Sequence, residues 1–420
     1  MHLGVIADDF TGATDIASFL VNNGMPTIQL NSIPKQPIII DDSTEAIVIS
    51  LKSRSCPVDI AVKQSIEAIR WLKKQGCSQF YFKYCSTFDS TPTGNIGPVT
   101  DALLNELGES FTIISPSLPV NGRTVYQGYL FVMDQLLSDS GMRNHPINPM
   151  TQSSLIRLME QQSSGKCGLV PYSIMEKGDD AIKQQLTALK QQNYRYAVLD
   201  TLNEDHLISQ GRAVSDLKLV TGGSGLAIGI AKNFVKKEVD LKQTQALGRP
   251  QGSKTILLSG SCSLMTNKQV MFYKKIAPTY ALDVEKCVNQ LSDYCQVVID
   301  WIDKNNKQKN APLIYATTDT TELKAIQQKW GIEKSSKAIE AFFEKLVIAL
   351  EKKSYDKYIV AGGETSGVVA QALNVNGFYI GPTIAPGVPW VRAINKPISL
   401  ALKSGNFGDE TFFVKAQGEF

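Results

Sequence analysis

The sequence predicts an α/β protein of two domains, each with a mostly parallel sheet covered by helices. Short apolar runs alternate with amphipathic helical patterns along most of the chain, and strands separated by helices pair in parallel. The chain has 420 residues, which is too long for one ordinary hydrophobic core. A polar stretch divides it near residue 245. We therefore expect two α/β domains rather than one.

Eight short apolar runs have the length and composition of buried strands. They lie at residues 5–7, 46–49, 80–84, 112–114, 217–220, 255–258, 313–316 and 357–360. A domain boundary is expected at residues 236–254, which are rich in Lys and Gln and contain Gly248, Pro250 and Gly252. The N-terminal domain would then span residues 1–235 and the C-terminal domain residues 255–420. Two such domains commonly hold a small ligand in the cleft between them.

Composition excludes several classes of protein. The net charge is 43 − 40 = +3, which gives no support for binding nucleic acid or a membrane surface. No apolar run reaches the ~18 residues needed to span a bilayer, and no signal-peptide pattern is visible. The seven cysteines contain no C-x-x-C pair, so reduced thiols in the cytoplasm are expected. The three histidines, His2, His145 and His206, lie in no hydrolase or metal motif. A homo-oligomer stays possible.

Two adjacent carboxylates, Asp8 and Asp9, directly follow the first apolar run. A helical pattern begins immediately afterwards, and Asn22, Asn23 and Gly24 provide a helix stop. The carboxyl end of a strand in a parallel sheet is where ligands bind. We predict that at least one of these carboxylates is a general base, a hydroxyl ligand or a magnesium ligand. The alternative is that one of them only caps the helix.

Three glycine-rich turns, at residues 221–225, 259–263 and 362–367, each follow an apolar run and precede a helical pattern. Glycine lets the backbone approach an anion closely, and the free N–H groups of a helix start point at it. Any one such turn alone is more often an ordinary tight turn. The turns 259–263 and 362–367 lie in one expected domain, and this pairing favours phosphate binding.

Polar loops of the N-terminal half carry three cations, Arg54, Lys83 and Arg123. They could converge on a substrate carboxylate, because arginine binds carboxylate in bidentate fashion. Ordinary surface or salt-bridge roles are the alternative for each.

The common nucleotide motifs are absent, since the chain has neither a P-loop signature nor the protein-kinase set. An NAD(P)-dependent oxidoreductase is one rival, because Gly223 and Gly225 open a helical pattern. However, the third glycine of that fingerprint, Gly229, comes one residue late. A non-catalytic sugar-acid-binding protein is the other rival, and it leaves the two phosphate-type turns unexplained.

Motifs along the whole chain resemble the four-carbon acid-sugar kinase family. They lie, in the expected order, at residues 7–13, 53–55, 221–225, 259–263, 361–367, 384–390 and 402–408. The resemblance implies an N-terminal acid-sugar-binding domain and a C-terminal ATP-binding domain. Residues 83–87 and 95–99, together with the long loop 86–97, resemble the branch that phosphorylates the C4 hydroxyl of 3-oxo-tetronates. The branches for threonate and erythronate are the alternative.

The resemblance, combined with the turn chemistry, yields a set of expected site residues. Asp8 and Asp9 are expected to be catalytic, and ATP and Mg²⁺ are the expected partners of the sugar acid. The expected substrate contacts are Arg54, Lys83, Asn95 and Arg123. The expected ATP contacts are Ser259, Gly260, Ser261, Gly362, Gly363, Glu364, Thr365 and Gly405.

Overall fold

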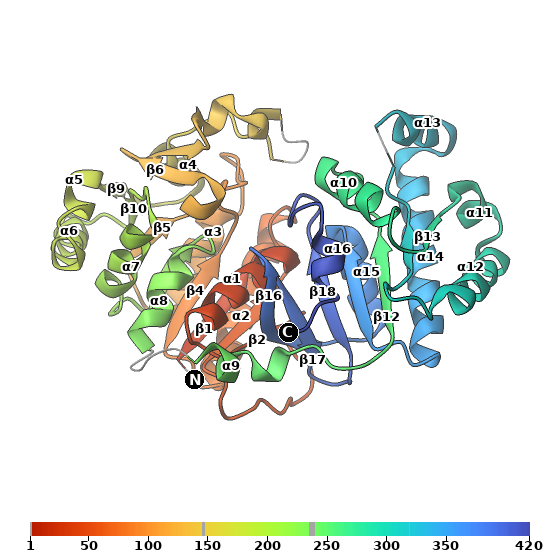
Figure 1. Cartoon of the computed structure of the whole chain (residues 1–420). Coiled ribbons are helices and arrows are strands. Elements are labelled where there is room, and N and C mark those ends of the chain that lie inside the picture. Colours follow the sequence, from red (N-terminus) through yellow and green to blue (C-terminus); the bar gives the residue numbers. More distant parts are fainter. Residues whose placement is uncertain (1, 145–147, 235–239, 319) are drawn as a thin grey trace. The chain divides into compact units, whose positions relative to one another are not determined.

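The chain folds into two compact units, Met1–Thr244 and Gln245–Phe420. The computed structural model describes residues 2–144, 148–234, 240–318 and 320–420 (Figure 1). The division falls within the stretch 236–254 that we expect to be a linker. Residues 236–239 of that stretch lie outside the described residues, and its remainder contains α9 (Leu241–Thr244) and the short 3-10 helix η4 (Ala246–Gly248). Both units are α/β, as predicted.

The N-terminal unit contains a parallel sheet with the strand order β2-β3-β1-β4-β11-β5-β10-β9. Its strands are β1 (Leu3–Ala7), β2 (Thr27–Leu30), β3 (Ala46–Ser50), β4 (Gln79–Lys83), β5 (Thr112–Ser115), β9 (Cys167–Val170), β10 (Tyr196–Leu199) and β11 (Leu219–Gly222). All residues of β1 and β3 are buried, as expected for strands covered on both faces.

Two rows of helices cover this sheet (Figure 1). Consecutive contacts join α1 (Phe10–Asn22), α8 (Leu226–Phe234), α7 (Glu204–Ala213), α6 (Asp179–Gln191) and α5 (Tyr172–Met175) in one row. The other row joins α2 (Val58–Lys74), α3 (Ile96–Leu107) and α4 (Leu155–Gln162). A separate antiparallel sheet consists of β6 (Arg123–Tyr126), β7 (Tyr129–Val132) and β8 (Gln135–Leu136). The unit is thus three layers thick, with the parallel sheet in the middle.

The sheet of the C-terminal unit has the order β13-β14-β12-β15-β18-β17-β16. Its strands are β12 (Thr255–Ser259), β13 (Thr279–Ala281), β14 (Leu313–Tyr315), β15 (Lys357–Ala361), β16 (Gly377–Ala385), β17 (Val388–Ala393) and β18 (Ser399–Lys403). Pairing is parallel from β13 to β18 and antiparallel for β17 with both of its neighbours.

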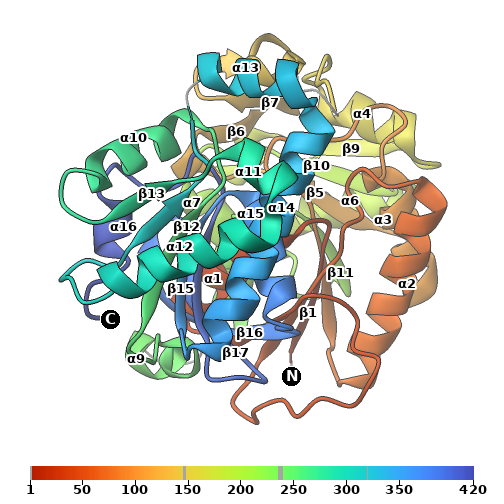
Figure 2. The same ribbon diagram turned by 90° about the vertical axis from the view of Figure 1, so that its right-hand side faces the viewer.

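Helices also cover the C-terminal sheet, and Figure 2 shows α12 and α14 in front of its strands. The contacting group is α11 (Val284–Asn289), α12 (Leu291–Asn305), α13 (Thr320–Trp330), α14 (Ile332–Lys352) and α15 (Gly363–Ala372). A second contacting pair is α10 (Leu264–Tyr273) and α16 (Phe412–Lys415). The rings of Tyr273 and Phe413 from this pair meet edge to face, 5.7 Å apart, in the same buried cluster as Leu257 and Ile359 of the sheet.

All eight apolar runs predicted as strands are strands. The run at 217–220 is a strand, but the observed strand begins two residues later than predicted, at Leu219. The reason is that Leu217 N–H donates to Val214 O at the end of α7. Seven strands of the two main sheets were not predicted: β2, β9, β10, β13, β16, β17 and β18.

In each main sheet, the strands that follow the first strand are added first on one side of it and then on the other. In the N-terminal unit, β2 and β3 lie on one side of β1, and β4 lies on the other. In the C-terminal unit, β13 and β14 lie on one side of β12, and β15 lies on the other. Loops at the carboxyl ends of such strands diverge there and leave a crevice, which is the usual ligand site of an open α/β sheet. Asp8, Asp9, Arg54 and Lys83 lie at the first of these places, and the turns 259–263 and 362–367 lie at the second.

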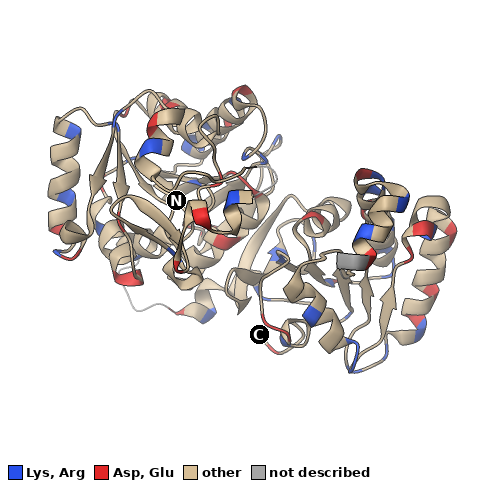
Figure 3. Ribbon diagram, turned by 90° about the horizontal axis from the view of Figure 1, so that it is seen from above, with Lys and Arg blue, Asp and Glu red and all other residues tan. Residues whose placement is uncertain are grey.

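Figure 3 shows blue and red segments interspersed over the helices of both units. Within the part of the chain that the structure describes, no helix is long and apolar enough to cross a membrane.

Helices α7 and α8 approach each other so closely that glycine is required. A Cβ atom on Gly229 would overlap Leu207 O, and one on Gly211 would overlap the backbone of Gly229. Gly229→Ala should therefore lower the free energy of unfolding by about 2 kcal/mol through overpacking, as measured by urea denaturation. Gly141→Ala is the control, because a Cβ there meets no atom within 4 Å. Equal stability of the two variants would contradict this account.

Candidate functional site

Asp8 and Asp9 follow β1 and have different surroundings. Asp9 is the N-cap of α1, and its Oδ1 accepts a hydrogen bond from Gly12 N–H at 3.1 Å. Capping is therefore one real function of Asp9, as the alternative interpretation held. Its side chain stays 30% exposed, whereas that of Asp8 is only 6% exposed. Asp9 is thus the carboxylate of the pair that a ligand can reach.

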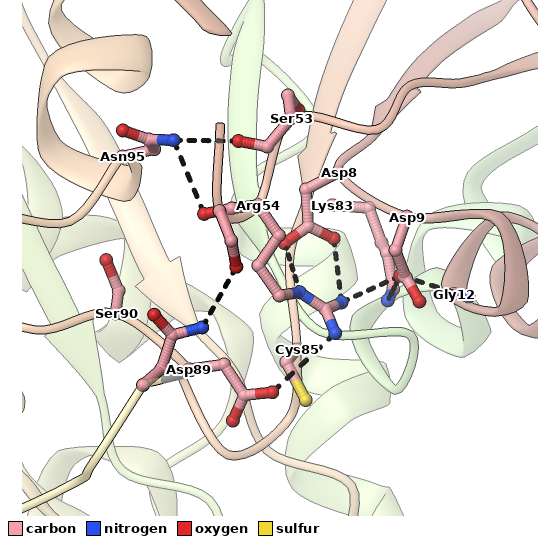
Figure 4. A network of polar contacts seen from close by, with 12 residues as sticks. Asp8, Asp9, Gly12, Ser53, Arg54, Lys83, Cys85, Asp89, Ser90 and Asn95 are labelled. Atoms are coloured by element: carbon pink, nitrogen blue, oxygen red, sulfur yellow. Dashed lines mark hydrogen bonds and ion pairs between the residues drawn. The ribbon is translucent and has the colours of Figure 1, made fainter. Parts of the chain in front are cut away.

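Arg54 joins the two carboxylates (Figure 4). Its Nε donates to Asp8 Oδ2 at 2.8 Å, and its Nη2 donates to Asp8 Oδ1 at 2.9 Å and to Asp9 Oδ1 at 2.7 Å. The backbone N–H of Arg54 also donates to Asp8 O at 3.2 Å. Since Ala7 is opposite Ser50 in the sheet, the loop after β3 starts beside the loop after β1. Most of the donors of Arg54 are therefore committed to the protein's own carboxylates.

Lys83, the last residue of β4, brings a second cation to the same place. Ala7 is opposite Lys83 in the register of β1 and β4, and Lys83 Nζ lies 3.6 Å from Asp9 Oδ1. A Cβ atom on Gly12 would overlap Lys83 Nζ, so this glycine makes room for the ammonium beside the start of α1. Lys83 is buried, and the part of the chain that the structure describes provides no hydrogen bond to its Nζ. Asp9 is the carboxylate with which its ammonium forms an ion pair in the described residues.

The loop after β4 adds a third carboxylate, Asp89, which the sequence analysis did not select. Asp89 Oδ2 lies 3.6 Å from Arg54 Nη1, and its Oδ1 accepts from Thr87 Oγ1 at 2.7 Å. Phe88 has a left-handed backbone (φ 62°) and a fully buried ring that packs edge to face on Tyr84. Such a backbone is costly for a bulky residue. The buried ring holds the loop in this form, with the neighbouring Asp89 beside Arg54.

Asn95 and Arg123, two expected substrate contacts, have other partners. Asn95 Nδ2 donates to the backbone carbonyls of Ser53, Arg54 and Cys56 at 2.8–3.3 Å, so it fixes the loop that carries Arg54. Arg123 lies in β6 of the separate antiparallel sheet and donates to Asn121 O. No contact among the described residues joins Arg123 to the cluster around Arg54. Both assignments as substrate contacts remain predictions.

Charge and burial divide the functions of these groups. Burial is the largest influence on Asp8 and raises its pKa, against the opposing effect of Arg54. Burial alone would also raise the pKa of Asp9, but Lys83 and Arg54 outweigh it and lower this pKa. Burial would lower the pKa of Arg54, yet Asp8 and Asp9 raise it well above its ordinary value. The lowered pKa favours the ionised form of Asp9 at neutral pH.

A small cavity lies against Asp8, Arg54, Asp89 and Asn95. Its free volume of about 240 Å³ includes open solvent, and only a small part of that volume is wide enough for a water molecule. That is room for one water and not for a four-carbon acid. A ligand larger than water could reach the cluster only from the side on which Asp9 is exposed.

In the C-terminal unit, the turns 259–263 and 362–367 and the loop after β18 meet at one edge of the sheet. Ser259 is opposite Ala361, and Ala361 is opposite Lys403. A Cβ atom on Gly260 would overlap Thr365 Oγ1. One on Gly405 would lie 2.6 Å from Ser261 Oγ and 2.9 Å from Ser263 Cβ. The glycines thus allow three loops to touch.

These loops present donors that suit a phosphate. Helix α15 begins at Gly363, after Gly362 with φ 121°, so the N–H groups of its first turn lack intrahelical partners. Glu364 lies exposed in this first turn, and Thr365 is buried beneath it. Ser259 Oγ shares a hydrogen bond with Thr317 Oγ1 from the loop after β14. The expected ATP contacts are therefore neighbours, although their contact with ATP stays a prediction.

The third glycine turn, 221–225, has a structural explanation. Cβ atoms on Gly222, Gly223 and Gly225 would overlap the carbonyl oxygens of residues 115, 116 and 117, respectively. These glycines therefore permit close packing against the chain after β5 and do not face a ligand. Ser224 donates to Asp15 Oδ2 on α1, and burial raises the pKa of Asp15. The dinucleotide interpretation of this turn loses its physical basis.

No ready-made metal site is present among the described residues, because no group of three or more His, Cys, Asp or Glu side chains could hold an ion. His206 bonds through Nε2 to Glu176 at 2.8 Å, and His145 lies outside the described residues. Mg²⁺ characteristically keeps several waters and binds through one or two carboxylates plus substrate phosphates. A site of that kind needs no preformed cluster of protein ligands.

Two family models match most of the chain. A sugar-binding N-terminal domain matches residues 3–230, and a nucleotide-binding C-terminal domain matches residues 256–413. A curated protein of Pectobacterium atrosepticum named 3-oxo-tetronate kinase is 59% identical, with coverage of 100% of this chain and 99% of the relative. An Escherichia coli protein of the same name is 56% identical over 92% of this chain and 99% of its own length.

Two solved structures share both fold and sequence with the chain. One, described as a putative tRNA synthase from Salmonella typhimurium, has a TM-score of 0.94 and 56% identity, and covers 100% of this chain and 99% of its own. The other, a Haemophilus influenzae protein of family DUF1537, has a TM-score of 0.88 and 52% identity, with 99% of each chain covered. The chain therefore belongs to the four-carbon acid-sugar kinase family, DUF1537, which joins a sugar-binding N-terminal domain to a nucleotide-binding C-terminal domain.

Proposed function

We propose that the chain is an ATP-dependent 3-oxo-tetronate kinase. It transfers the γ-phosphate of ATP to the C4 hydroxyl of a 3-oxo-tetronate and yields ADP and the 4-phosphate. Full-length relatives at 54–59% identity carry this name, and none of them is named a threonate or erythronate kinase. The observation that carries the proposal is the cluster at the end of β1, where an exposed carboxylate, Asp9, lies beside a buried lysine, Lys83.

Asp9 is the proposed general base. Both oxygens of Asp8 are bonded by Arg54, whereas Asp9 is bonded through Oδ1 only. Phosphoryl transfer requires positioning and charge neutralisation more than covalent chemistry. Asp9 Oδ2 would accept the proton of the C4 hydroxyl while the C4 oxygen forms a bond to the γ-phosphorus of ATP. At the same time, the bond between the γ-phosphorus and the oxygen that it shares with the β-phosphate would break, and ADP would leave. Asp8 would act indirectly, by holding the guanidinium that orients Asp9.

Lys83 is the proposed anion contact for the substrate. Arg54 was expected to hold the sugar carboxylate, but three carboxylates, Asp8, Asp9 and Asp89, already surround it. The network of Figure 4 has more carboxylates than cations, so its centre is a poor site for another carboxylate. Lys83 Nζ points to the start of α1. Its ammonium and the first N–H groups of α1 suit an anion or a polarised keto oxygen.

ATP would lie on the turns 259–263 and 362–367 and on the backbone of Gly405. Their free N–H groups and the N-terminus of α15 provide partial positive charge for the phosphates. Mg²⁺, bound to those phosphates, would neutralise the charge that develops on the oxygen leaving the γ-phosphorus. We place the reaction in the cytoplasm, where the seven unpaired thiols would stay reduced.

A coupled ADP-release assay over four-carbon acids tests the substrate. ADP release should depend on an added 3-oxo-tetronate and should be slower with tetronates that lack the oxo group. A thermal-shift assay with ATP–Mg²⁺ and NAD serves as the control for the cofactor, since a bound ligand stabilises the folded state. Stabilisation by NAD and not by ATP would refute the kinase assignment.

Asp9→Asn tests the base. Asparagine is also a good N-cap, so α1 should stay intact while kcat falls on the order of a hundredfold or more. Asp8→Asn is the matched variant, because it removes a carboxylate from the same cluster but one that Arg54 already occupies. A larger loss of kcat in Asp8→Asn than in Asp9→Asn would move the assignment to Asp8.

Gly405→Ala tests the ATP loops. Its Cβ would press on Ser261 Oγ and Ser263 Cβ, so the KM for ATP should rise while the KM for the sugar acid changes little. Gly141→Ala is the control, because Gly141 lies outside the ATP loops and a Cβ there meets no atom within 4 Å. A fall in apparent kcat with both KM values unchanged would point to partial unfolding of the unit instead, and equal rises of both KM values would contradict a site specific for ATP.

A further inference from the structure

A buried lysine, Lys403, lies at the junction of the three ATP loops and was not among the expected site residues. It is the last residue of β18, and its side chain is almost completely buried. Its backbone carbonyl accepts from Gly362 N–H at 2.9 Å. Lys403 therefore contacts the turn 362–367 through its backbone, and its side chain is free to organise the other loops.

The ammonium of Lys403 has three neutral acceptors. Nζ donates to Gly405 O at 2.8 Å, to Thr266 Oγ1 at 3.0 Å and to Ser404 O at 3.1 Å. The Thr266 hydroxyl donates its own proton to Gly405 O at 2.7 Å and accepts from Ser263 Oγ at 3.1 Å. Thr266 must therefore accept from Lys403. All three oxygen atoms accept a hydrogen bond from Nζ, and only the protonated amine has three N–H groups to donate.

No negative charge balances this ammonium. No carboxylate among the described residues lies within ion-pair distance of Lys403 Nζ, and the ring of Phe412 lies 5.9 Å away. The titratable groups on the helices and loop packed around it are Lys268, Tyr273, Glu364, Asp409, Glu410 and Lys415. Lys268 pairs with Glu410, and Lys415 pairs with Asp409. On the flanking strands, Lys357 and Arg392 lie opposite Ser399, at the other end of β18.

Two physical effects therefore oppose each other at Lys403. Burial away from water disfavours the ammonium and lowers the pKa of Lys403 to about 7. The three acceptors favour the ammonium, because the neutral amine would leave one of them without a donor. A nearby anion would tip this balance towards the protonated form. The backbone of Gly405, a proposed ATP contact, is in direct contact with Nζ.

We propose that Lys403 is a positioning residue of the nucleotide site, whose buried ammonium fixes the backbone at Ser404 and Gly405 and whose missing counter-charge is the phosphate of bound ATP. The inference rests on the proposed binding of ATP at these loops. Its consequence is that ATP binding and protonation of Lys403 favour each other, since coupling between two sites is reciprocal. ATP affinity should then fall as the pH rises above about 7.

Calorimetry of ATP–Mg²⁺ binding without the sugar acid tests this coupling. Titrations in two buffers with different ionisation enthalpies measure the protons taken up. Between about pH 7 and pH 9, the wild-type protein should take up part of a proton for each ATP bound. Lys403→Met, which keeps the volume but cannot titrate, should take up less, and its KM for ATP should rise on the order of tenfold with the KM for the sugar acid unchanged. The difference between the proton uptake of the wild-type protein and that of Lys403→Met removes the contribution of protons that ATP itself binds or releases.

The control is Lys396→Met, which removes a lysine that pairs with Glu351 outside these loops and should leave proton uptake unchanged. If Lys403→Met does not fold, Thr266→Val takes its place. Loss of one acceptor should shift the proton-uptake profile to lower pH. The inference would be overturned if the wild-type protein bound ATP without proton uptake, or if neither variant changed the proton-uptake profile. Either result would leave the proposed function intact. Failure of the wild-type protein to bind ATP would instead contradict the proposed function.

Discussion

The ion pair between Arg54 and Asp8 is the interaction on which the N-terminal site depends. Two adjacent buried carboxylates would repel each other and lose their hydration, and the bidentate guanidinium offsets both costs. Arg54 also reaches Asp9 and Asp89, so one side chain connects the ends of three loops. Removing it would leave uncompensated buried charge, which is far more damaging than the loss of an exposed salt bridge.

The two units place their candidate residues at similar positions in the sheet but use different types of residue there. Both place their candidate residues at the point where the sheet changes its direction of growth. The N-terminal unit fills that place with charged side chains, which suits a hydroxyl acid and proton transfer. The C-terminal unit fills it with glycine, serine and threonine around one buried lysine, which suits the phosphates of a nucleotide. The difference in residue type fits the proposed division between a unit that binds the phosphoryl acceptor and a unit that binds the phosphoryl donor.

Much of the fold could be predicted from sequence, because the central parallel strands are continuous apolar runs followed by clear helical patterns. The missed strands have weaker signals. In β16 and β17, Gly381, Pro382 and Pro389 interrupt the pattern, although their antiparallel pairing tolerates such breaks with shifts of register. Strand order could not be predicted, because it depends on which helix packs on which face, and the sequence alone does not state this.

The candidate site was predictable where a residue lies next to a strand end, as for Asp8, Asp9 and Lys83. Prediction was less informative where the function of a residue depends on a partner distant in sequence. The sequence selected Arg54 as a substrate contact, but it could not show the ion pair with Asp8, because the two residues are 46 positions apart. Asn95 gave no sign that its amide binds the carbonyls of the Arg54 loop. Lys403 was not selected, because β18 was not predicted and because its burial depends on contacts with α10 and α16, which no local pattern reveals.

The loop from Tyr84 to Asn95 has a further consequence for the evolution of this site. Gln162, at the end of α4, binds Ser90 Oγ, Ser90 O, Thr91 O and Gly97 N–H, while Phe88 anchors the loop in the core. The loop is therefore held by Phe88 in the core, by the contacts of Asp89 and Asn95 with the Arg54 loop, and by one glutamine from a helix distant in sequence. Such a segment behaves as a cassette: a recombinant that exchanges the loop keeps its conformation only if the glutamine of α4 moves with it.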